Sequence, residues 1–184
     1  MQRDCFILNR WVTLAMAFLI VLGATGVAAA QALPQVKLTN DLDRPGEGYC
    51  IDILGVGPTA RADLPLVAHN CLPDLPRVDR HAVFTDGRIR FPAFEACVTA
   101  FGVVTPLPGA PVILRPCGAS ESFLPAADLQ RFTFNLAGQF QLVGSDLCLT
   151  VGAMSARTFS ASDRWRTLTM QMCSDGPAEL SKWN

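Results

Sequence analysis

The chain has 184 residues, with 15 basic and 16 acidic side chains and a formal net charge of −1. Because basic and acidic side chains are nearly equal in number, the chain lacks the excess of basic residues that neutralises phosphates. This argues against nucleic acid as a partner. The length suits one domain with a substantial buried core.

The N-terminal residues 1–32 have the pattern of a secretory signal peptide. Arg3 and Arg10 supply positive charge, residues 11–27 are almost uncharged and apolar, and small residues follow. A retained membrane anchor is the alternative, but a run of this length is at the lower limit of a spanning helix, about 17 residues. We expect a helical signal that is cleaved, secretion to the periplasm or the cell exterior, and no stable membrane insertion of residues 33–184.

The rest of the chain predicts an all-β domain. Short stretches of alternating apolar and polar residues, separated by glycine turns, are typical of strands. Such stretches lie, in chain order, at residues 36–39, 88–91, 132–134, 139–142 and 168–172. The clearest turns are residues 85–88 and 136–139, and helix is expected at most as a short turn around residues 126–129. About four strands in each of three units predict about twelve strands.

Six cysteines remain after signal cleavage, because Cys5 is removed with the signal. An even number in an exported chain implies a disulfide framework, although six cysteines can pair in many ways. The cysteines recur as three pairs with a period of about 50 residues, which marks one structural unit built three times. This repeat favours bonds within each unit. The expected disulfides are Cys50–Cys71, Cys97–Cys117 and Cys148–Cys173. Tight Cys-x-x-Cys spacing is absent, so neither a structural metal nor a cofactor is expected.

The first cysteine of each pair begins a similar stretch: Cys-Ile-Asp-Ile, Cys-Val-Thr-Ala and Cys-Leu-Thr-Val. This pattern resembles the ricin B-chain type lectin domain, whose units each contain a Cys-apolar-Asp-apolar strand, an internal disulfide and a closing Gln-x-Trp. Closing motifs are found here at residues 82–84, 130–132 and 181–183. All three keep an aromatic residue, and Gln130 keeps the glutamine.

The resemblance covers residues 35–184 and implies a β-trefoil. The implied repeats are about 35–82, 83–130 and 131–184, within a single ricin B-like domain at residues 33–184.

The resemblance also implies where a sugar would bind. In the family, an aspartate two residues after the first cysteine accepts hydrogen bonds from sugar hydroxyls, an aromatic before the second cysteine stacks on the sugar, and an amide precedes the closing motif. The first repeat offers Asp52, His69 as the stacking ring, Asn70 beside it, and His81 in place of the amide. We therefore predict weak carbohydrate binding, of millimolar strength, mainly through this repeat. The alternative is that Asp52 caps a turn and that His69 is an ordinary histidine.

The other two repeats lack the aspartate, so we expect no sugar there. They have Thr99, Arg115 and Leu129, and Thr150, Gln171 and Leu180, at the corresponding positions. Arg115 and Gln130 are expected to form a solvated surface pair.

A second prediction concerns residues 152–166, the longest variable loop. Arg157, Arg164 and Trp165 lie there, and tryptophan among arginines is typical of binding hot spots. Trp165 could instead fold over the edge of the core. The alternative function is therefore a degenerate β-trefoil that binds a protein, such as a toxin-accessory subunit, most simply as a monomer.

An enzyme is not expected. Ser145, His69 and Asp52 supply the residue types of a catalytic triad, but the chain has no nucleophile elbow, metal-ligand cluster or phosphate loop.

Overall fold

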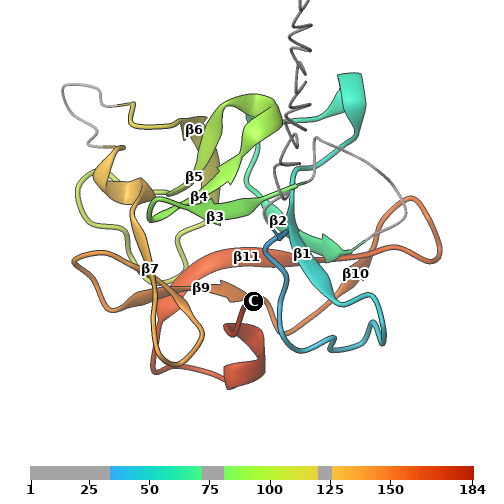
Figure 1. The fold of residues 1–184 in the computed structure, drawn as a ribbon. Helices are drawn as coiled ribbons and strands as arrows, with labels where there is room; N and C mark the ends of the chain where they lie inside the picture. Colours follow the sequence, from blue (N-terminus) through green and yellow to red (C-terminus); the bar gives the residue numbers. More distant parts are fainter. Residues whose placement is uncertain (1–33, 72–80, 120–125) are drawn as a thin grey trace, which may run out of the picture. The chain divides into compact units, whose positions relative to one another are not determined.

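The computed structural model describes residues 34–71, 81–119 and 126–184 (Figure 1). The predicted signal peptide, residues 1–32, lies outside this part of the chain. The described residues confirm the all-β class, since they form strands and 3-10 turns and contain no α-helix. They belong to one compact unit, Ala32–Asn184.

The strands are short, as the alternating stretches predict. In chain order they are β1 (Tyr49–Asp52), β2 (Val67–Asn70), β3 (Val83–Thr85), β4 (Arg88–Phe91), β5 (Ala96–Ala100), β6 (Val112–Pro116), β7 (Phe132–Phe134), β8 (Phe140–Leu142), β9 (Leu147–Val151), β10 (Ala156–Arg157) and β11 (Arg164–Met172). The 3-10 turns are η1 (Gly57–Thr59), η3 (Pro92–Phe94), η4 (Asp128–Gln130) and η5 (Ala178–Leu180).

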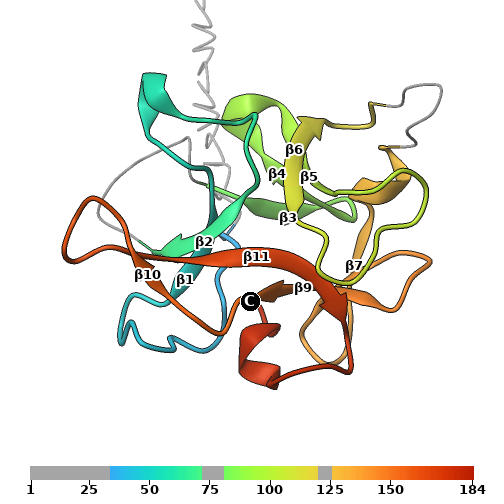
Figure 2. The ribbon, with the colours of Figure 1, turned by 180° about the vertical axis from the view of Figure 1, so that it is seen from behind.

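Two sheets contain these strands. A seven-stranded sheet has the order β1-β2-β11-β9-β8-β7, with β10 paired to β11, and a four-stranded sheet has the order β3-β4-β5-β6. The long strand β11 connects the first cysteine pair to the third, because it pairs with β2 at one end and with β9 at the other. Figure 2 shows β11 crossing the molecule between these two strands.

The three predicted disulfides are all formed, each within its own cysteine pair. Their presence is consistent with an oxidising compartment. The strand with the first cysteine of each pair also pairs with the strand that leads to the second cysteine, and the register is the same in all three cases: β1 with β2, β5 with β6, and β9 with β11. The residue opposite the first cysteine is His69 in β2, Arg115 in β6 and Gln171 in β11.

The strands β2, β6 and β11 also meet one another. The backbone N–H of Leu66 donates to the carbonyl of Val112 at 2.8 Å, and that of Met170 donates to Ala110 at 2.8 Å. Thr167 pairs with Val67. The last strand of each cysteine pair therefore contacts the other two.

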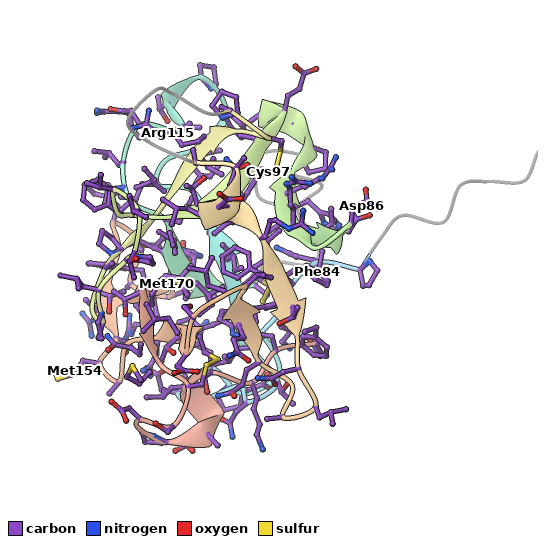
Figure 3. All side chains as sticks on the ribbon, turned by 90° about the vertical axis from the view of Figure 1, so that its left-hand side faces the viewer. Phe84, Asp86, Cys97, Arg115, Met154 and Met170 are labelled. Carbon is purple, nitrogen blue, oxygen red and sulfur yellow. A yellow bond between two sulfur atoms is a disulfide. The ribbon has the colours of Figure 1, made fainter. Side chains whose placement is uncertain are left out.

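The aromatic residues of the closing motifs pack in or against the core. Phe132 and Trp183 are buried, and the Trp183 indole donates to the Leu149 carbonyl at 3.0 Å. Phe84 is partly buried and packs against Phe140 in a tilted arrangement, with ring centroids 4.9 Å apart. Figure 3 shows the contrast between interior Met170 and Met154, which projects from the surface.

The predicted turn at residues 85–88 joins β3 to β4. Asp86 and Gly87 both have positive φ, 52° and 70°. This combination suits a two-residue hairpin turn, in which a glycine bears little steric cost.

The N-terminal stretch 36–39 was expected to form a strand, and that expectation is wrong. It makes single bridges to three separate segments, which join Gln35 to Val83, Lys37 to Cys50 and Leu38 to Trp183. Alternation correctly indicates the buried side chains, Val36 and Leu38. Alternation does not show whether a single neighbouring strand pairs with the whole stretch, and among the described residues none does.

Candidate functional site

Two of the predicted sugar-binding residues lie together in the first repeat. Asp52 ends β1 and His69 lies in β2, on the same face of the strand pair. An oxygen of Asp52 lies 3.9 Å from His69 Nδ1. Both are buried, with relative exposures of 4% and 8%. Asp52 also accepts a hydrogen bond from the Ile53 N–H at 2.7 Å.

Trp165 lies beside this pair. It is directly opposite His69 across β2 and β11, and it is half-buried. Asp52, His69 and Trp165 therefore lie on one face of three adjacent strands, although the sequence assigned them to two different sites. The prediction that Arg164 and Trp165 belong to a loop is wrong, because both open β11. Arg157 is exposed in β10, opposite Arg164.

Asn70 does not join them, because neighbouring residues of a strand point to opposite faces. Its amide group is buried and engaged: it donates to Glu47 at 2.8 Å and accepts from the Arg164 N–H at 2.9 Å. A hydrogen bond from Arg44, aided by the one from Asn70, lowers the pKa of Glu47 despite some burial. His81 is half-buried just before β3, in the other sheet.

His69 Nδ1 also lies 3.0 Å from the carbonyl oxygen of Asn70. Because a carbonyl and a carboxylate oxygen both lie near this nitrogen, we assign the ring proton to Nδ1. Ser145, the third member of the possible triad, lies between β8 and β9, where its hydroxyl donates to the Leu142 carbonyl at 3.1 Å.

Sequence reasoning missed an ionic network on the opposite face of β11, in which Arg166 is buried and its partner Asp43 is partly exposed to solvent. Arg166 donates to Asp43 at 2.6 Å and to the carbonyl oxygens of Gly152 and Ala153. Its guanidinium lies over the Tyr49 ring, 4.9 Å from the centroid.

Asp43 also accepts hydrogen bonds from the Tyr49 hydroxyl at 2.7 Å and from Ser155 at 2.5 Å. Burial alone would raise the pKa of Asp43, but hydrogen bonds from Arg166, Ser155 and Tyr49 hold it well below its ordinary value. A signal was available in the sequence: Arg166 shares the two-residue period of buried Leu168 and Met170. An inward arginine at such a position requires a partner.

Gln130 is also a structural residue. It is fully buried, whereas the sequence predicted a solvated pair with Arg115. Its amide oxygen accepts from the Gly118 N–H at 2.8 Å, and its amide nitrogen donates to Thr99 and to the Pro116 carbonyl, both at 3.1 Å. Gln130 thus ties the closing motif of the second repeat to both strands of the cysteine pair.

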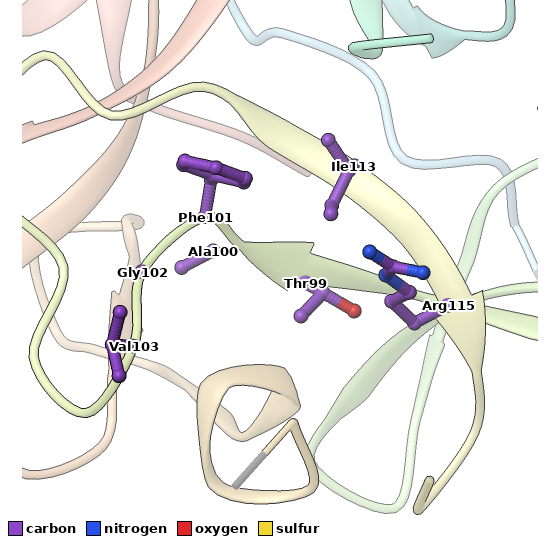
Figure 4. Close-up of a pocket in the computed structure, with 7 residues that line it drawn as sticks. All are labelled: Thr99, Ala100, Phe101, Gly102, Val103, Ile113 and Arg115. Carbon is purple, nitrogen blue, oxygen red and sulfur yellow. The ribbon is translucent and has the colours of Figure 1, made fainter. Parts of the chain in front are cut away.

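The second repeat, expected to bind no sugar, contains a hollow (Figure 4). Its lining comes from β5, β6 and the loop after β5, and is mostly apolar. The lining residues are Thr99, Ala100, Phe101, Gly102, Val103, Ile113 and Arg115.

The loop after β5, which supplies part of this lining, carries further exposed apolar side chains. We call residues 101–107 the apolar loop. Phe101, Val103, Val104 and Leu107 have relative exposures of 56%, 62%, 70% and 72%. Exposed apolar side chains that gather in this way mark surfaces that other molecules cover.

Metal ligands do not gather in the part of the chain that the structure describes: no group of three or more His, Cys, Asp or Glu could hold an ion there. Within the described ranges, no helix has the length and apolar character to span a membrane.

Comparisons with known proteins bear on the fold. No protein-family model matches the chain. No curated protein matches it either. Among solved structures 26 chains match. One is the solution structure of an mdaA-1 domain, with a TM-score of 0.54 and 14% sequence identity over 85% of this chain and 92% of that one. At this identity the likeness concerns the fold alone.

Proposed function

We propose that this protein is a secreted, non-catalytic binding module with a ricin B-like β-trefoil fold, and that it binds a partner protein through the apolar loop. The observation that carries the proposal is the exposure of four large apolar side chains within seven residues. Covering them would remove apolar surface from water, which is the main driving force of protein association.

Several features support the trefoil part of the proposal. Three disulfide-bonded strand pairs share one register, and the last strand of each pair contacts the other two. Each closing motif also places an aromatic ring in or against the core. A threefold repeat of one β unit accounts for all of these features.

The same geometry favours a protein over a sugar as the partner. A sugar needs polar groups at an accessible surface, and the polar groups of the first repeat are buried. Asn70, moreover, has its amide occupied by Glu47 and Arg164. Side chains of the apolar loop are, by contrast, accessible.

The proposal is tested by making the loop polar. The double variant Val104→Asp/Leu107→Asp changes two exposed positions, so the fold should persist. The control is Leu136→Asp, which places one added carboxylate, against two in the double variant, at a fully exposed position between β7 and β8. Wild-type and control protein should recover the same partner from the medium or periplasm of the producing cell, and the double variant should lose it. Equal recovery by all three would refute the loop as the interface.

A second candidate function is supported by one observation, the common face of Asp52, His69 and Trp165. Asp52 and His69 are buried, so the half-buried Trp165 ring would supply most of the affinity by stacking on a sugar ring. We propose this face as a weak glycan site. Trp165→Ala should abolish retention on a glycan array, whereas Thr150→Ala, at the position of Asp52 in the third repeat, should not change it. Retention by Trp165→Ala would exclude the site.

A further inference from the structure

Among the residues that the structure describes, Arg115 is the one charged residue that lines the hollow beside β5 and β6. Arg115 lies in β6 and is exposed. It makes no hydrogen bond or ion pair with any residue in the described ranges, unlike Arg44, Arg61 and Arg166. Toward the described residues its guanidinium donors are therefore free, at the edge of an apolar surface.

The neighbours of Arg115 fix its position relative to the apolar residues. It lies on the same face as Thr99 and Ile113, because Cys97 pairs with Arg115 and Thr99 with Ile113. Phe101 continues this face from the end of β5. In the close-up, Thr99, Ile113 and Arg115 lie side by side, with Phe101 and Val103 across the hollow (Figure 4).

Polar groups other than Arg115 contribute little here. The Thr99 hydroxyl donates to the Cys97 carbonyl and accepts from Gln130, and Thr99 is buried. The other lining side chains in the described ranges are apolar, and none of those is acidic. A ligand that fits must therefore be apolar where it meets Phe101, Val103 and Ile113, and anionic where it meets Arg115.

We infer that the hollow receives an apolar side chain of the partner protein together with an adjacent carboxylate, which Arg115 binds. This inference rests on the proposed function and names the partner's chemistry. An acidic-apolar peptide segment fits better than a small free acid, because Val104 and Leu107, which follow the lining residue Val103 in the chain, add exposed apolar side chains outside the hollow. A small acid would leave them in water, whereas a peptide would cover both.

Bidentate contact with a carboxylate explains why arginine suits this position. A guanidinium offers paired N–H donors that match the two oxygens of a carboxylate. A lone exposed ion pair contributes little in water, but the contact strengthens when a partner covers the apolar surroundings and excludes water. The apolar loop and Arg115 would then act together.

The test uses short peptides as probes. The first is acetyl-Leu-Glu-Leu-amide, the second replaces Glu by Gln, and the third probe is 4-methylpentanoate, a small apolar acid. Each is titrated to millimolar concentration into ¹⁵N-labelled protein, secreted from the full chain, and amide shifts are followed by NMR. The variants are Arg115→Gln and the control Arg157→Gln, an exposed arginine on a different hairpin.

The acidic peptide should shift the amides of Phe101, Val103 and Ile113. Its dissociation constant should rise about tenfold for the Gln peptide, and about tenfold for Arg115→Gln, but should not change for Arg157→Gln. Equal binding of the two peptides, or no effect of Arg115→Gln, would overturn the inference. So would an absence of shifts, or 4-methylpentanoate binding as tightly as the acidic peptide, which would indicate a small-acid site.

The partner assay separates this inference from the proposed function. If Arg115→Gln retains the partner while Val104→Asp/Leu107→Asp loses it, the interface stands and the carboxylate contact is refuted. If both variants retain the partner, both proposals fail.

Discussion

Replacing Gln130 by leucine tests whether the closing motif holds the second cysteine pair together. The substitution keeps the approximate volume of the side chain and removes its three hydrogen bonds, to Gly118, Thr99 and Pro116. Each bond contributes about 1 kcal/mol net. Leucine buries additional apolar atoms, which offsets about 1 kcal/mol of this loss. The unfolding free energy should therefore fall by about 2 kcal/mol.

The loss of unfolding free energy is not larger, because Pro116 and Gly118 lie at the surface, where water can replace their hydrogen bonds to Gln130. With a denaturant slope of about 2 kcal/mol per molar urea, the unfolding midpoint should fall by about 1 M. Urea unfolding under non-reducing conditions measures this shift.

Gln171→Leu is the matched control. Gln171 is half-buried in β11, and its amide donates to a single side chain, Thr169, at 3.1 Å. Its replacement should change stability by less than about 0.5 kcal/mol. If Gln130→Leu were no more destabilising than Gln171→Leu, the role assigned to the Gln130 hydrogen bonds would be refuted.

Three further predictions concern stability. Because folding lowers the pKa of Asp43, the contribution of this carboxylate to stability is fully present above the ordinary aspartate pKa of about 4 and is lost as pH falls through the folded value. The urea midpoint of the wild type should therefore approach that of Asp43→Asn as pH falls. A constant difference between the two midpoints at every pH would contradict this. Loss of one disulfide in Cys97→Ser/Cys117→Ser should cost about 3 kcal/mol, measured by urea unfolding, and an unchanged midpoint would argue against the bridge. Gly55→Ala should lower the thermal unfolding midpoint more than Gly57→Ala. Both glycines have positive φ, but only at Gly55 would the new Cβ meet backbone, 2.2 Å from the Thr59 carbonyl oxygen. Equal decreases of the midpoint in the two variants would refute the clash.

The sequence predicted those parts of the fold that depend on local pattern and on repetition. Alternation identified strands such as β4 and β7, and cysteine spacing predicted the three disulfides. Each of these signals lies within one repeat. Repetition makes such a signal visible three times, which is why the pairing within units could be preferred over all other connectivities.

The candidate site was predicted less completely, because it depends on contacts between repeats. Asp52 and His69 lie in one strand pair, and the family resemblance suggested both. Trp165 reaches them through the pairing of β11 with β2, which joins the third repeat to the first. Nothing in the local sequence indicates that pairing. The same strand carries Arg166 to Asp43, and this network too joins distant segments.

The three disulfide-bonded strand pairs place different side chains at equivalent positions of the same backbone pairing. Opposite the first cysteine stand His69, Arg115 and Gln171, and the backbone pairing is the same in each case. The register is fixed by the disulfide and by the buried residues of the opposite face, so it does not depend on which of these side chains is present. A substitution there can change what a repeat contacts without disturbing the strand pair. Thr99 and Arg115 in the second strand pair, where the first has Asp52 and His69, are therefore compatible with a surface that contacts a different kind of partner.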